Sequence, residues 1–409
     1  MEEISRYAVG VDIGTGTVRS VVASIDNSGT PTIVGFSETP NSGMRKGVVV
    51  YLAGPGRAID TALGEVERMS GYEVNEATFN INGTHITSTK TDGMIAMSSP
   101  DHQIDDSDLD RLEDVAATGK IPPNRDILEL VPYSYRLDGQ STIKDPIGMS
   151  GMRLEIRANV ISALTPHCQN ITKAAELAHV SANRLVASPV AAARAVLTER
   201  QLENGVAIID LGASTTSLAM FEEGDLQYAS VLPYGSNNIT NDLAMGLKTD
   251  PEIAEDIKVH HASATPSEDH KDVLIKQGKE ELAFSRVEID EIVEARLEEI
   301  FDGIRKELKK AGYDRKLPEG IVLVGGGANL RNIVEYAKSK LELSVKVGKP
   351  SGFAGVGEGV EKPEFAVSVG LMLIDTQNGT GNSTSANKKS RSKGNGKKII
   401  NRIFRKIKF

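Results

Sequence analysis

Two glycine-rich turns, each preceded by an apolar run and an aspartate, most constrain what this chain can fold into. The first lies in Tyr7–Ser20 (YAVGVDIGTGTVRS) and the second in Val206–Phe221 (VAIIDLGASTTSLAMF). In each, β-branched residues lead into Asp-x-Gly, small hydroxyl residues follow, and a second alternating run comes next, which predicts strand, tight turn and strand. Glycine lets a ligand approach the backbone closely, and a row of unpaired N–H groups binds phosphate. The pair therefore predicts two phosphate clamps, one from each half of a two-lobed protein.

A third glycine-rich segment supports a single ligand site. Gly320–Asn329 reads GIVLVGGGAN, which predicts a short buried strand that runs into three glycines before a helical stretch. Such a turn suits a flat ligand against the backbone or a phosphate at a helix N-terminus. Each piece has an ordinary alternative, a hairpin turn for the two Asp-x-Gly segments and a flexible loop for Gly325–Gly327. All three in this order, separated by helical blocks, favour a shared site.

The order and content of these motifs resemble the actin, Hsp70 and sugar-kinase ATPase superfamily, whose phosphate 1, phosphate 2 and adenosine motifs they would be. Within it, four stretches resemble the bacterial division protein family FtsA: Asn41–Leu52 (NSGMRKGVVVYL), Asp145–Leu154 (DPIGMSGMRL), Val231–Thr240 (VLPYGSNNIT) and Ala254–His260 (AEDIKVH). The resemblance covers Val9 to Ile374. It implies an α/β fold, the two-lobed actin-like (ribonuclease H-like) ATPase fold with an inserted small α+β subdomain and a C-terminal amphipathic helix.

Composition narrows the class of protein. With 409 residues the chain is long enough for two lobes, and its 39% hydrophobic content fits a globular protein. Cys168 is the only cysteine, which excludes an intramolecular disulfide and favours a reducing cytosol. The net charge of −9 is uneven: ten Lys or Arg and no acidic residue follow Asp375, so residues 1–375 carry −19. We therefore expect no nucleic-acid partner for the body and an anionic surface as the target of the tail.

The chain is expected to divide into five parts. They are a first lobe (1–82, with 162–203 and 363–375), an inserted α+β subdomain (83–161), a second lobe (204–362, with an outer helical subdomain at about 237–312), a flexible linker (376–396) and an amphipathic membrane-targeting helix (397–409). The alternative for 83–161 is a long decoration of the first lobe. Expected helices are 56–70, 105–117, a helical block over 166–204, and 287–311; expected strands include 77–82, 86–97, 127–137 and 153–163.

The resemblance implies a site for ATP and Mg²⁺ between the lobes. Asp12 and Asp210 would hold the metal ion, mostly through water, because Mg²⁺ keeps much of its hydration shell. Arg19 falls where actin has a phosphate-contacting lysine. Glu255 and Lys258 match positions near the ribose and base, with a surface ion pair as the alternative. The phosphate cradles would be Gly14, Thr15, Gly16 and Thr17 with Gly212, Ala213, Ser214 and Thr215, and Gly326, Gly327 and Ala328 would lie against the adenosine.

Three positions depart from the superfamily pattern. Ala213 stands where many relatives have glycine, and Ser217 where they often have aspartate. Ser188 opens Ser-Pro-Val-Ala-Ala-Ala, which resembles the Glu-Pro-x-Ala-Ala-Ala stretch whose glutamate positions the attacking water. A serine cannot act as a carboxylate base, and orienting water is a large part of phosphoryl transfer. We therefore expect slow or absent hydrolysis, and we predict no catalytic residue.

The C-terminus, KKIINRIFRKIKF from Lys397 to Phe409, predicts an amphipathic helix. Its apolar residues cover an arc of about 140° at 100° per residue, and basic residues fill most of the rest. At ~20 Å it is too short to cross a bilayer but suits its interface. The alternatives are a docking helix for another protein or a basic end that binds RNA weakly. The expected membrane-binding residues are Ile399, Ile400, Arg402, Ile403, Phe404, Arg405 and Ile407.

The resemblance implies a cell division protein that polymerises head to tail, tethers filaments of the tubulin-like FtsZ (the Z ring) to the cytoplasmic face of the cell membrane at the septum, and recruits later division proteins. FtsZ would bind through its acidic C-terminal tail at about 237–312, where Lys258, Arg296, Arg305, Lys306, Lys309 and Lys310 are available. The alternatives are the related pilus-assembly adaptor, a sugar or acid kinase, for which no catalytic base is evident, and an Hsp70-like chaperone, which would need a peptide-binding domain.

Overall fold

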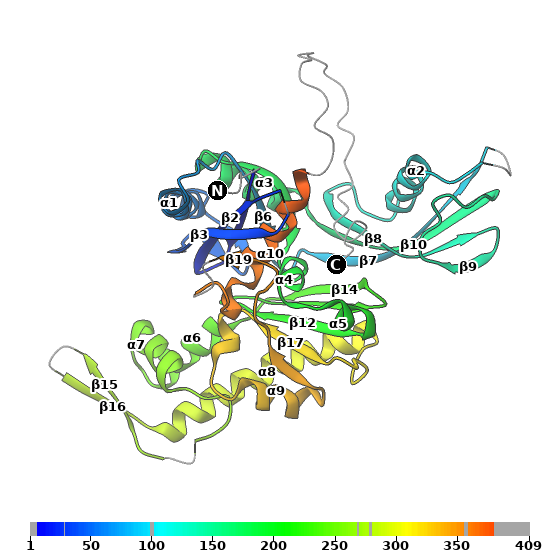
Figure 1. The fold of residues 1–409 in the computed structure, drawn as a ribbon. Coiled ribbons are helices and arrows are strands. Elements are labelled where there is room, and N and C mark those ends of the chain that lie inside the picture. The colour runs from blue at the N-terminus through cyan, green and yellow to red at the C-terminus, as the bar shows by residue number, and fades with distance from the viewer. Residues whose placement is uncertain are drawn as a thin grey trace.

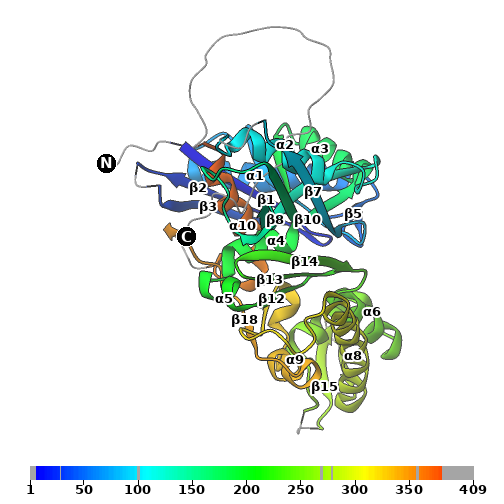
Figure 2. The ribbon, with the colours of Figure 1, turned by 90° about the vertical axis from the view of Figure 1, so that its right-hand side faces the viewer.

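The computed structural model describes residues 6–379 apart from 28, 99–101, 268–269, 278–279 and 356–358. Two α/β lobes lie one above the other, and a four-stranded sheet with one helix projects from the upper lobe (Figure 1). A long hairpin extends from the lower lobe on the opposite side. The view turned by 90° keeps the two lobes stacked and places both central sheets between outer helices (Figure 2). The fold is therefore α/β and two-lobed, as the motifs predict.

The first lobe is built on a six-stranded sheet in the order β11-β6-β1-β2-β3-β19. Its strands are β1 (Arg6–Ile13), β2 (Thr17–Ile25), β3 (Pro31–Pro40), β6 (Glu76–Ile81), β11 (Ser181–Ala187) and β19 (Ala354–Gly355). The first three pair antiparallel, whereas β6 pairs parallel to both β1 and β11. A small hairpin joins β4 (Met44–Arg45) to β5 (Val48–Val49). The helices of this lobe are α1 (Ala53–Ser70), α3 (Thr165–Leu177), α4 (Ser188–Val196) and α10 (Ala366–Asp375).

The second lobe repeats this arrangement. Its sheet has the order β14-β13-β12-β17-β18, with three antiparallel strands followed by parallel ones. The strands are β12 (Val206–Leu211), β13 (Thr216–Glu222), β14 (Asp225–Leu232), β17 (Ile321–Val324) and β18 (Val345–Val347). The helices are α5 (Glu199–Asn204), α6 (Ser236–Gly246), α7 (Pro251–Asp256), α8 (Arg286–Ala311) and α9 (Ile333–Leu341), with a π-helical turn at Ile257–His261. In both lobes the glycine turn joins the first two strands of the sheet.

The segment between β6 and α3 forms its own antiparallel sheet in the order β7-β10-β8-β9. Its strands are β7 (Thr87–Ala96), β8 (Arg125–Leu137), β9 (Gln140–Ile143) and β10 (Arg153–Leu164), and α2 (Asp106–Ala117) packs on β7 and β10. Asp105 caps α2 and accepts hydrogen bonds from the backbone of Ser107 and Asp108, which explains why the helix begins there. We call residues 83–161 the inserted subdomain.

Two elements differ from the sequence expectations. The helical block predicted over 166–204 is interrupted by strand β11, because Ser181–Ala187 (SANRLVA) pairs with β6 far away in the sequence and this pairing overrides its helix-forming residues. The outer part of the second lobe also contains a hairpin, β15 (Val273–Gln277) with β16 (Glu280–Phe284). The long helix predicted over 287–311 is confirmed as α8, whose buried stripe includes Ile289, Val293 and Leu297.

The end of the described chain is tied to the first lobe. Asp375, the last residue of α10, accepts hydrogen bonds from the backbone N–H of Val9 (2.9 Å) and from Thr78 Oγ1 (2.7 Å). Thr376–Gly379 then form a short 3-10 helix at the start of the segment predicted as a linker. The rest of that segment and the predicted helix 397–409 lie outside the described residues. Across the described part of the chain, every helix is too short or too polar to span a bilayer.

Candidate functional site

The glycine-rich turns of both lobes line one cavity of about 510 Å³ between the lobes. This volume lies in the range typical of small-molecule sites. Of the residues predicted to bind nucleotide, fourteen line it: Asp12, Gly14, Thr15, Gly16, Thr17, Arg19, Asp210, Gly212, Ala213, Thr215, Glu255, Lys258, Gly326 and Gly327. The other two, Ser214 and Ala328, are neighbours of lining residues but are not part of the wall. The fold thus brings motifs from three distant parts of the sequence together.

We call Gly14–Thr17 and Gly212–Thr215 the phosphate turns, after the ligand predicted for them. Both are closed by a bond from a glycine N–H to a threonine carbonyl, and in both the carbonyl group of the first glycine accepts a further hydrogen bond. In the first, Gly14 N donates to Thr17 O (2.9 Å), and the Asn41 side chain donates to Gly14 O (2.7 Å). In the second, Gly212 N donates to Thr215 O (3.0 Å), and Ser236 N donates to Gly212 O (2.9 Å). The carbonyl groups are therefore turned away and paired, which leaves backbone N–H groups of the turns for a ligand.

Two buried carboxylates face the cavity, one from each lobe. Asp12 and Asp210 are each 8% exposed and are the last but one residue of β1 and of β12. Burial raises the pKa of Asp12 to about 7, with the nearby Asp210 charge adding to the rise, and burial raises the pKa of Asp210 to about 6. Arg19 opposes both shifts, and a hydrogen bond from Ser217 Oγ (3.3 Å) also lowers the pKa of Asp210. The pair carries negative charge that the protein compensates only in part.

Arg19 lies between the cavity and the edge of the first lobe. It lines the cavity, its Nη2 lies 2.6 Å from Glu38 Oε1, and its guanidinium group stacks over the Phe365 ring at 5.6 Å from the centroid. Glu38 is about half exposed, so this ion pair is weak and can exchange for a stronger anion. Arg19 thus places a positive charge in the wall of the same cavity that Asp12 and Asp210 line.

Glu255 and Lys258 form an ion pair that belongs to the wall of the cavity. Lys258 Nζ lies 2.7 Å from Glu255 Oε2 and donates to Thr240 Oγ1 (2.9 Å), and the lysine is only 9% exposed. The Glu255 side chain is 48% exposed, so the pair lies where the wall of the cavity meets the surface. Apolar side chains complete this end of the cavity: Ile239, Leu297, Ile300, Leu330 and Ile333. The arrangement offers an apolar surface next to one cation and one anion.

The third glycine run meets the second phosphate turn in close contact. A Cβ atom on Gly325, which has φ 83°, would lie 2.3 Å from Asp210 Oδ1, and one on Gly327 would lie 2.9 Å from Leu211 Cβ. Glycine is therefore required at both positions for the chain that follows β17 to turn against the end of β12. Gly326 has no atom near its Cβ position and faces open space in the cavity.

The polar residues of this site that sequence reasoning missed include Asn80 and Asn82. Asn80, buried in β6, accepts a hydrogen bond from Ile13 N (2.7 Å) and donates to Asp12 Oδ1 (2.6 Å) and Ser188 Oγ (3.0 Å). Asn82 donates from Nδ2 to Thr215 Oγ1 (3.2 Å) of the opposite lobe. The signal available was FNIN, a strand with amides on alternate residues and hence on one face.

Whether the cavity fits a metal ion depends on Asp12 and Asp210. The part of the chain that the structure describes contains no cluster of three or more His, Cys, Asp or Glu that could hold an ion. Two buried carboxylates that face one cavity suit a hydrated Mg²⁺, which takes one or two protein carboxylates and keeps waters. The predicted membrane-binding residues, Ile399 to Ile407, lie outside the described residues.

Comparison with known proteins identifies the family. The sequence model described as "Cell division protein FtsA" matches residues 207–370, and that of the "SHS2 domain inserted in FTSA" matches residues 83–162. The cell division protein FtsA of Neisseria meningitidis serogroup B is 33% identical over 377 residues, 91% of each chain. That of Pseudomonas aeruginosa is 32% identical over 376 residues, 91% of this chain and 90% of the relative.

Solved structures agree on the fold. A PilM–PilN type IV pilus biogenesis complex matches with a TM-score of 0.66 at 18% identity, over 90% of this chain and 98% of the other. MreB5 of Spiroplasma citri bound to ADP matches with a TM-score of 0.55 at 14% identity, over 91% and 97%. At such identities these likenesses establish the actin-like architecture alone. With sequence relatives over nearly its whole length, the chain belongs to the FtsA family of cell division proteins.

Proposed function

We propose that this division protein binds ATP with Mg²⁺ in the cavity between its lobes and uses the bound state to assemble. The observation that carries the proposal is the convergence of three glycine-rich turns and two buried carboxylates on one cavity. N–H groups of Gly14–Thr17 and Gly212–Thr215 would hold the phosphates. Asp12 and Asp210 would hold the water shell of the metal ion, whose charge would offset their own. Arg19 would exchange Glu38 for a phosphate oxygen.

The other end of the cavity fits a nucleoside. Gly326, Gly327 and Ala328 would lie against the adenosine, because no side chain stands between the backbone of Gly326 and the cavity. Glu255 would accept from ribose hydroxyls, and Lys258 would lie beside the base. The apolar side chains on α8 and α9 would cover the base's face.

Hydrolysis is proposed to be slow. Ser188, 1% exposed at the start of α4, stands where the superfamily glutamate would be and hydrogen-bonds Asn80, which also holds Asp12. Among the described residues that line the cavity, the acidic ones besides the two aspartates are Glu255 and Glu364. Glu255 is paired with Lys258, and Glu364 accepts a hydrogen bond from Asn329. The phosphate end therefore offers no free base to activate water.

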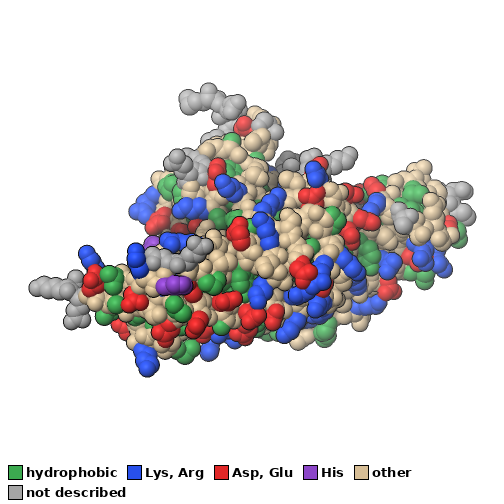
Figure 3. Space-filling view, turned by 90° about the horizontal axis from the view of Figure 1, so that it is seen from below, with side chains coloured by type: hydrophobic (Ala, Val, Ile, Leu, Met, Phe, Trp, Pro, Cys, Tyr) green, Lys and Arg blue, Asp and Glu red, His purple; other side chains and the backbone are tan. Residues whose placement is uncertain are grey.

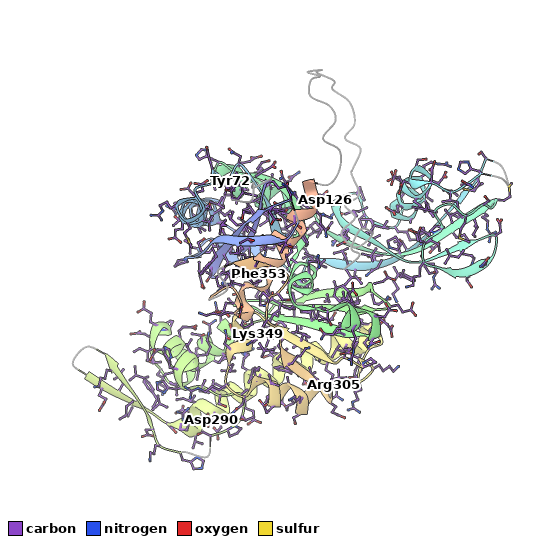
Figure 4. The ribbon with its side chains drawn as sticks, viewed as in Figure 1. Tyr72, Asp126, Asp290, Arg305, Lys349 and Phe353 are labelled. Carbon is purple, nitrogen blue, oxygen red and sulfur yellow. The ribbon has the colours of Figure 1, made fainter. Side chains whose placement is uncertain are left out.

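We further propose head-to-tail polymerisation and tethering of FtsZ filaments to the cytoplasmic face of the membrane at the septum. The acidic tail of FtsZ would dock on the outer part of the second lobe, about 237–312. Of the six basic residues available there, Arg296 pairs with Asp242, Lys310 with Glu307, Lys258 with Glu255, and Arg305, labelled in Figure 4, with Asp314 and Glu342. Acidic and basic side chains are interspersed on the underside of the molecule (Figure 3). Lys306 and Lys309, both exposed, remain the better candidates.

Membrane attachment would come from the helix predicted at 397–409. The five large apolar residues would contribute several kcal/mol on burial, with roughly 1 kcal/mol more for each basic residue near anionic lipid. The inserted subdomain would recruit later division proteins. The pilus-assembly adaptor and the small-molecule kinase are not favoured, because the sequence relatives above are cell division proteins.

The assembly proposal is tested with the full chain, Mg-ATP and anionic liposomes, imaged for filaments on the bilayer. We expect ordered arrays that recruit FtsZ. When Lys306 and Lys309 are both changed to Glu, the recruitment of FtsZ should be lost and the arrays should remain. Truncation after Asp375 should leave a folded protein that no longer pellets with the liposomes. Unchanged pelleting of the truncated chain would refute attachment through the tail.

A further inference from the structure

The base of the inserted subdomain contacts both phosphate turns. Asn82, where the chain leaves β6 for the inserted subdomain, lines the cavity between the lobes, and Gly83 follows it directly. The Asn82 amide donates to Thr215 Oγ1 of the second lobe (3.2 Å), and its Oδ1 accepts from Gly83 N (2.8 Å). Asn82, Thr215 and Thr15 all line the cavity. One side chain therefore joins the second phosphate turn to the first residue of the inserted subdomain.

The first phosphate turn reaches the same point through Gly47, in the turn between β4 and β5. Gly47 N donates to Thr15 Oγ1 (3.2 Å). The φ of Gly47 is 78°, in the left-handed region that favours glycine. A Cβ atom at Gly47 would lie 3.0 Å from Gly83 N and 3.2 Å from Asn82 C. Both turns are therefore linked to Asn82 and Gly83 through one or two residues.

His85 and Arg125 connect Asn82 to the strands of the inserted subdomain by hydrogen bonds. His85 Nδ1 accepts from Leu164 N (3.4 Å), so its Nε2 carries the proton and donates to Asn82 O (3.0 Å). Arg125 donates to the carbonyl groups of His85 and Ser162 and to Thr87 Oγ1, and so ties the entering strand to the returning one. Asp126, labelled in Figure 4, accepts from Thr165 Oγ1 (2.8 Å) at the same junction. A displacement of Asn82 is thus passed on to both strands.

The far side of the inserted subdomain rests on the second lobe. Asn159 Nδ2 donates to Leu226 O (3.1 Å, buried), and Lys144 Nζ lies 2.8 Å from Asp225 Oδ2. These contacts place β10 and the end of β9 against β14, as Figure 1 shows for the sheet that overhangs the lower lobe. The inserted subdomain is attached covalently to one lobe and by these contacts to the other.

We propose that Asn82 is a positioning residue that couples occupation of the phosphate turns to the orientation of the inserted subdomain. The proposal rests on the function proposed above and adds its regulation. A phosphate oxygen is a stronger acceptor than the neutral Thr215 hydroxyl, so the Asn82 amide moves its hydrogen bond from Thr215 to the phosphate. Gly83, His85 and the two joined strands follow. The two orientations of the inserted subdomain, with Asn82 bonded to Thr215 or to the phosphate, differ in their contacts with the ligand. Such a difference is what a ligand needs to shift the population from one to the other.

The test is a distance measurement between spin labels on Val115→Cys in α2 and Lys309→Cys in α8, both exposed positions. Native Cys168 is buried, and its pKa is raised to about 12 mainly by burial, so it stays unlabelled. We expect the distance distribution to change when Mg-ATP is added. In Asn82→Ala the change should be lost, while ATP affinity falls by roughly tenfold to a hundredfold, the usual effect of losing one hydrogen bond to a charged group.

Two further variants give the matched controls. Asn75→Ala removes an exposed amide that donates to the Glu73 carbonyl (3.5 Å), away from the cavity, and should behave like the parent. Thr215→Ser keeps the hydroxyl and should keep the change, whereas Thr215→Val should lose it. Bound ATP without any change in distance, or an equal change in Asn82→Ala, would overturn the coupling alone. Failure of the labelled parent to bind ATP would overturn the coupling together with the proposed function.

Discussion

The amide of Asn80 donates to Asp12 Oδ1 at 2.6 Å, and so a neutral side chain from β6 holds one of the two carboxylates in the cavity. The same amide donates to Ser188 Oγ at 3.0 Å. Asp12, Ser188 and the strand that leads to the inserted subdomain are thus joined by one side chain that is 2% exposed.

Asn80→Asp should destabilise the protein because it adds a third carboxylate beside Asp12. We expect the free energy of unfolding in urea to fall by about 1–3 kcal/mol at pH 8, where all three groups are ionised. The loss should be smaller at pH 6, where the carboxylates share a proton. Asn75→Asp, on an exposed turn, is the control and should change stability little at either pH. Equal stability of Asn80→Asp and the parent at both pH values would contradict the assigned contact.

Ser188→Glu should raise the rate of phosphate release from ATP. A carboxylate at this position can orient and activate water, and general base catalysis typically contributes at least about a hundredfold, so even an imperfect placement should give about tenfold. Ser188→Gln has nearly the same size without a base and should stay at the parent rate, as should Ser188→Ala. A glutamate variant that binds ATP normally yet hydrolyses no faster would show that Ser188 does not limit hydrolysis.

His85 should make stability sensitive to mild acid. Burial, the stacked His167 ring (centroids 4.3 Å apart) and Arg125 lower the pKa of His85 to about 4, although its bond to the Asn82 carbonyl opposes the shift. Because the pKa is lower in the folded state than in the unfolded state, the stabilisation is complete above about pH 6.5 and is lost as pH falls toward 4.

The measurement is urea unfolding of the parent and of His85→Gln at pH 7.5 and 5.0. The difference in free energy of unfolding between them should shrink by about 1 kcal/mol at the lower pH, a value reduced for a ring that is partly open to solvent. Taking the difference removes titrations common to both proteins, including those of Asp12 and Asp210. A difference that is the same at both pH values, within about 0.3 kcal/mol, would rule out a neutral His85 as the cause.

Gly370→Ala should disrupt the contact between α10 and α4. A Cβ atom at Gly370 would lie 1.8 Å from the Ala191 carbonyl oxygen, a backbone atom that cannot rotate away. We expect a loss of about 2–3 kcal/mol or more in the free energy of unfolding. Gly64→Ala is the matched control in α1, since nothing lies within 4 Å of its Cβ position, and it should stabilise by up to about 1 kcal/mol. The opposite order of the two variants in thermal unfolding would contradict the packing of α10.

The sequence predicted the phosphate turns because Asp12 and Asp210 each sit in a local strand–turn–strand pattern that needs no distant partner. It did not predict β11, because Ser181–Ala187 contains helix formers and becomes a strand only by pairing with β6. Asn80 and Asn82 also went unnoticed. Amides in a strand are unremarkable until the fold shows that one holds Asp12 and the other reaches Thr215.

The same contrast holds for Glu255 and Lys258, whose spacing in the sequence fits an exposed ion pair as well as it fits a pair that lines a cavity. Only the packing of α7 and the following π-helical turn against α6 buries Lys258 and places the pair in the wall of the cavity. Local patterns thus specify which residues form turns, whereas tertiary packing decides which of them share a cavity.

The most direct test of the central claim is isothermal titration calorimetry of the full chain with ATP and Mg²⁺. We expect one ATP bound per chain, with Asp12→Ala and Asp210→Ala each weakening the binding and Asn75→Ala leaving it unchanged. Absence of ATP binding by the folded parent protein, or equal binding by the double variant Asp12→Ala/Asp210→Ala, would contradict a nucleotide held between the two lobes.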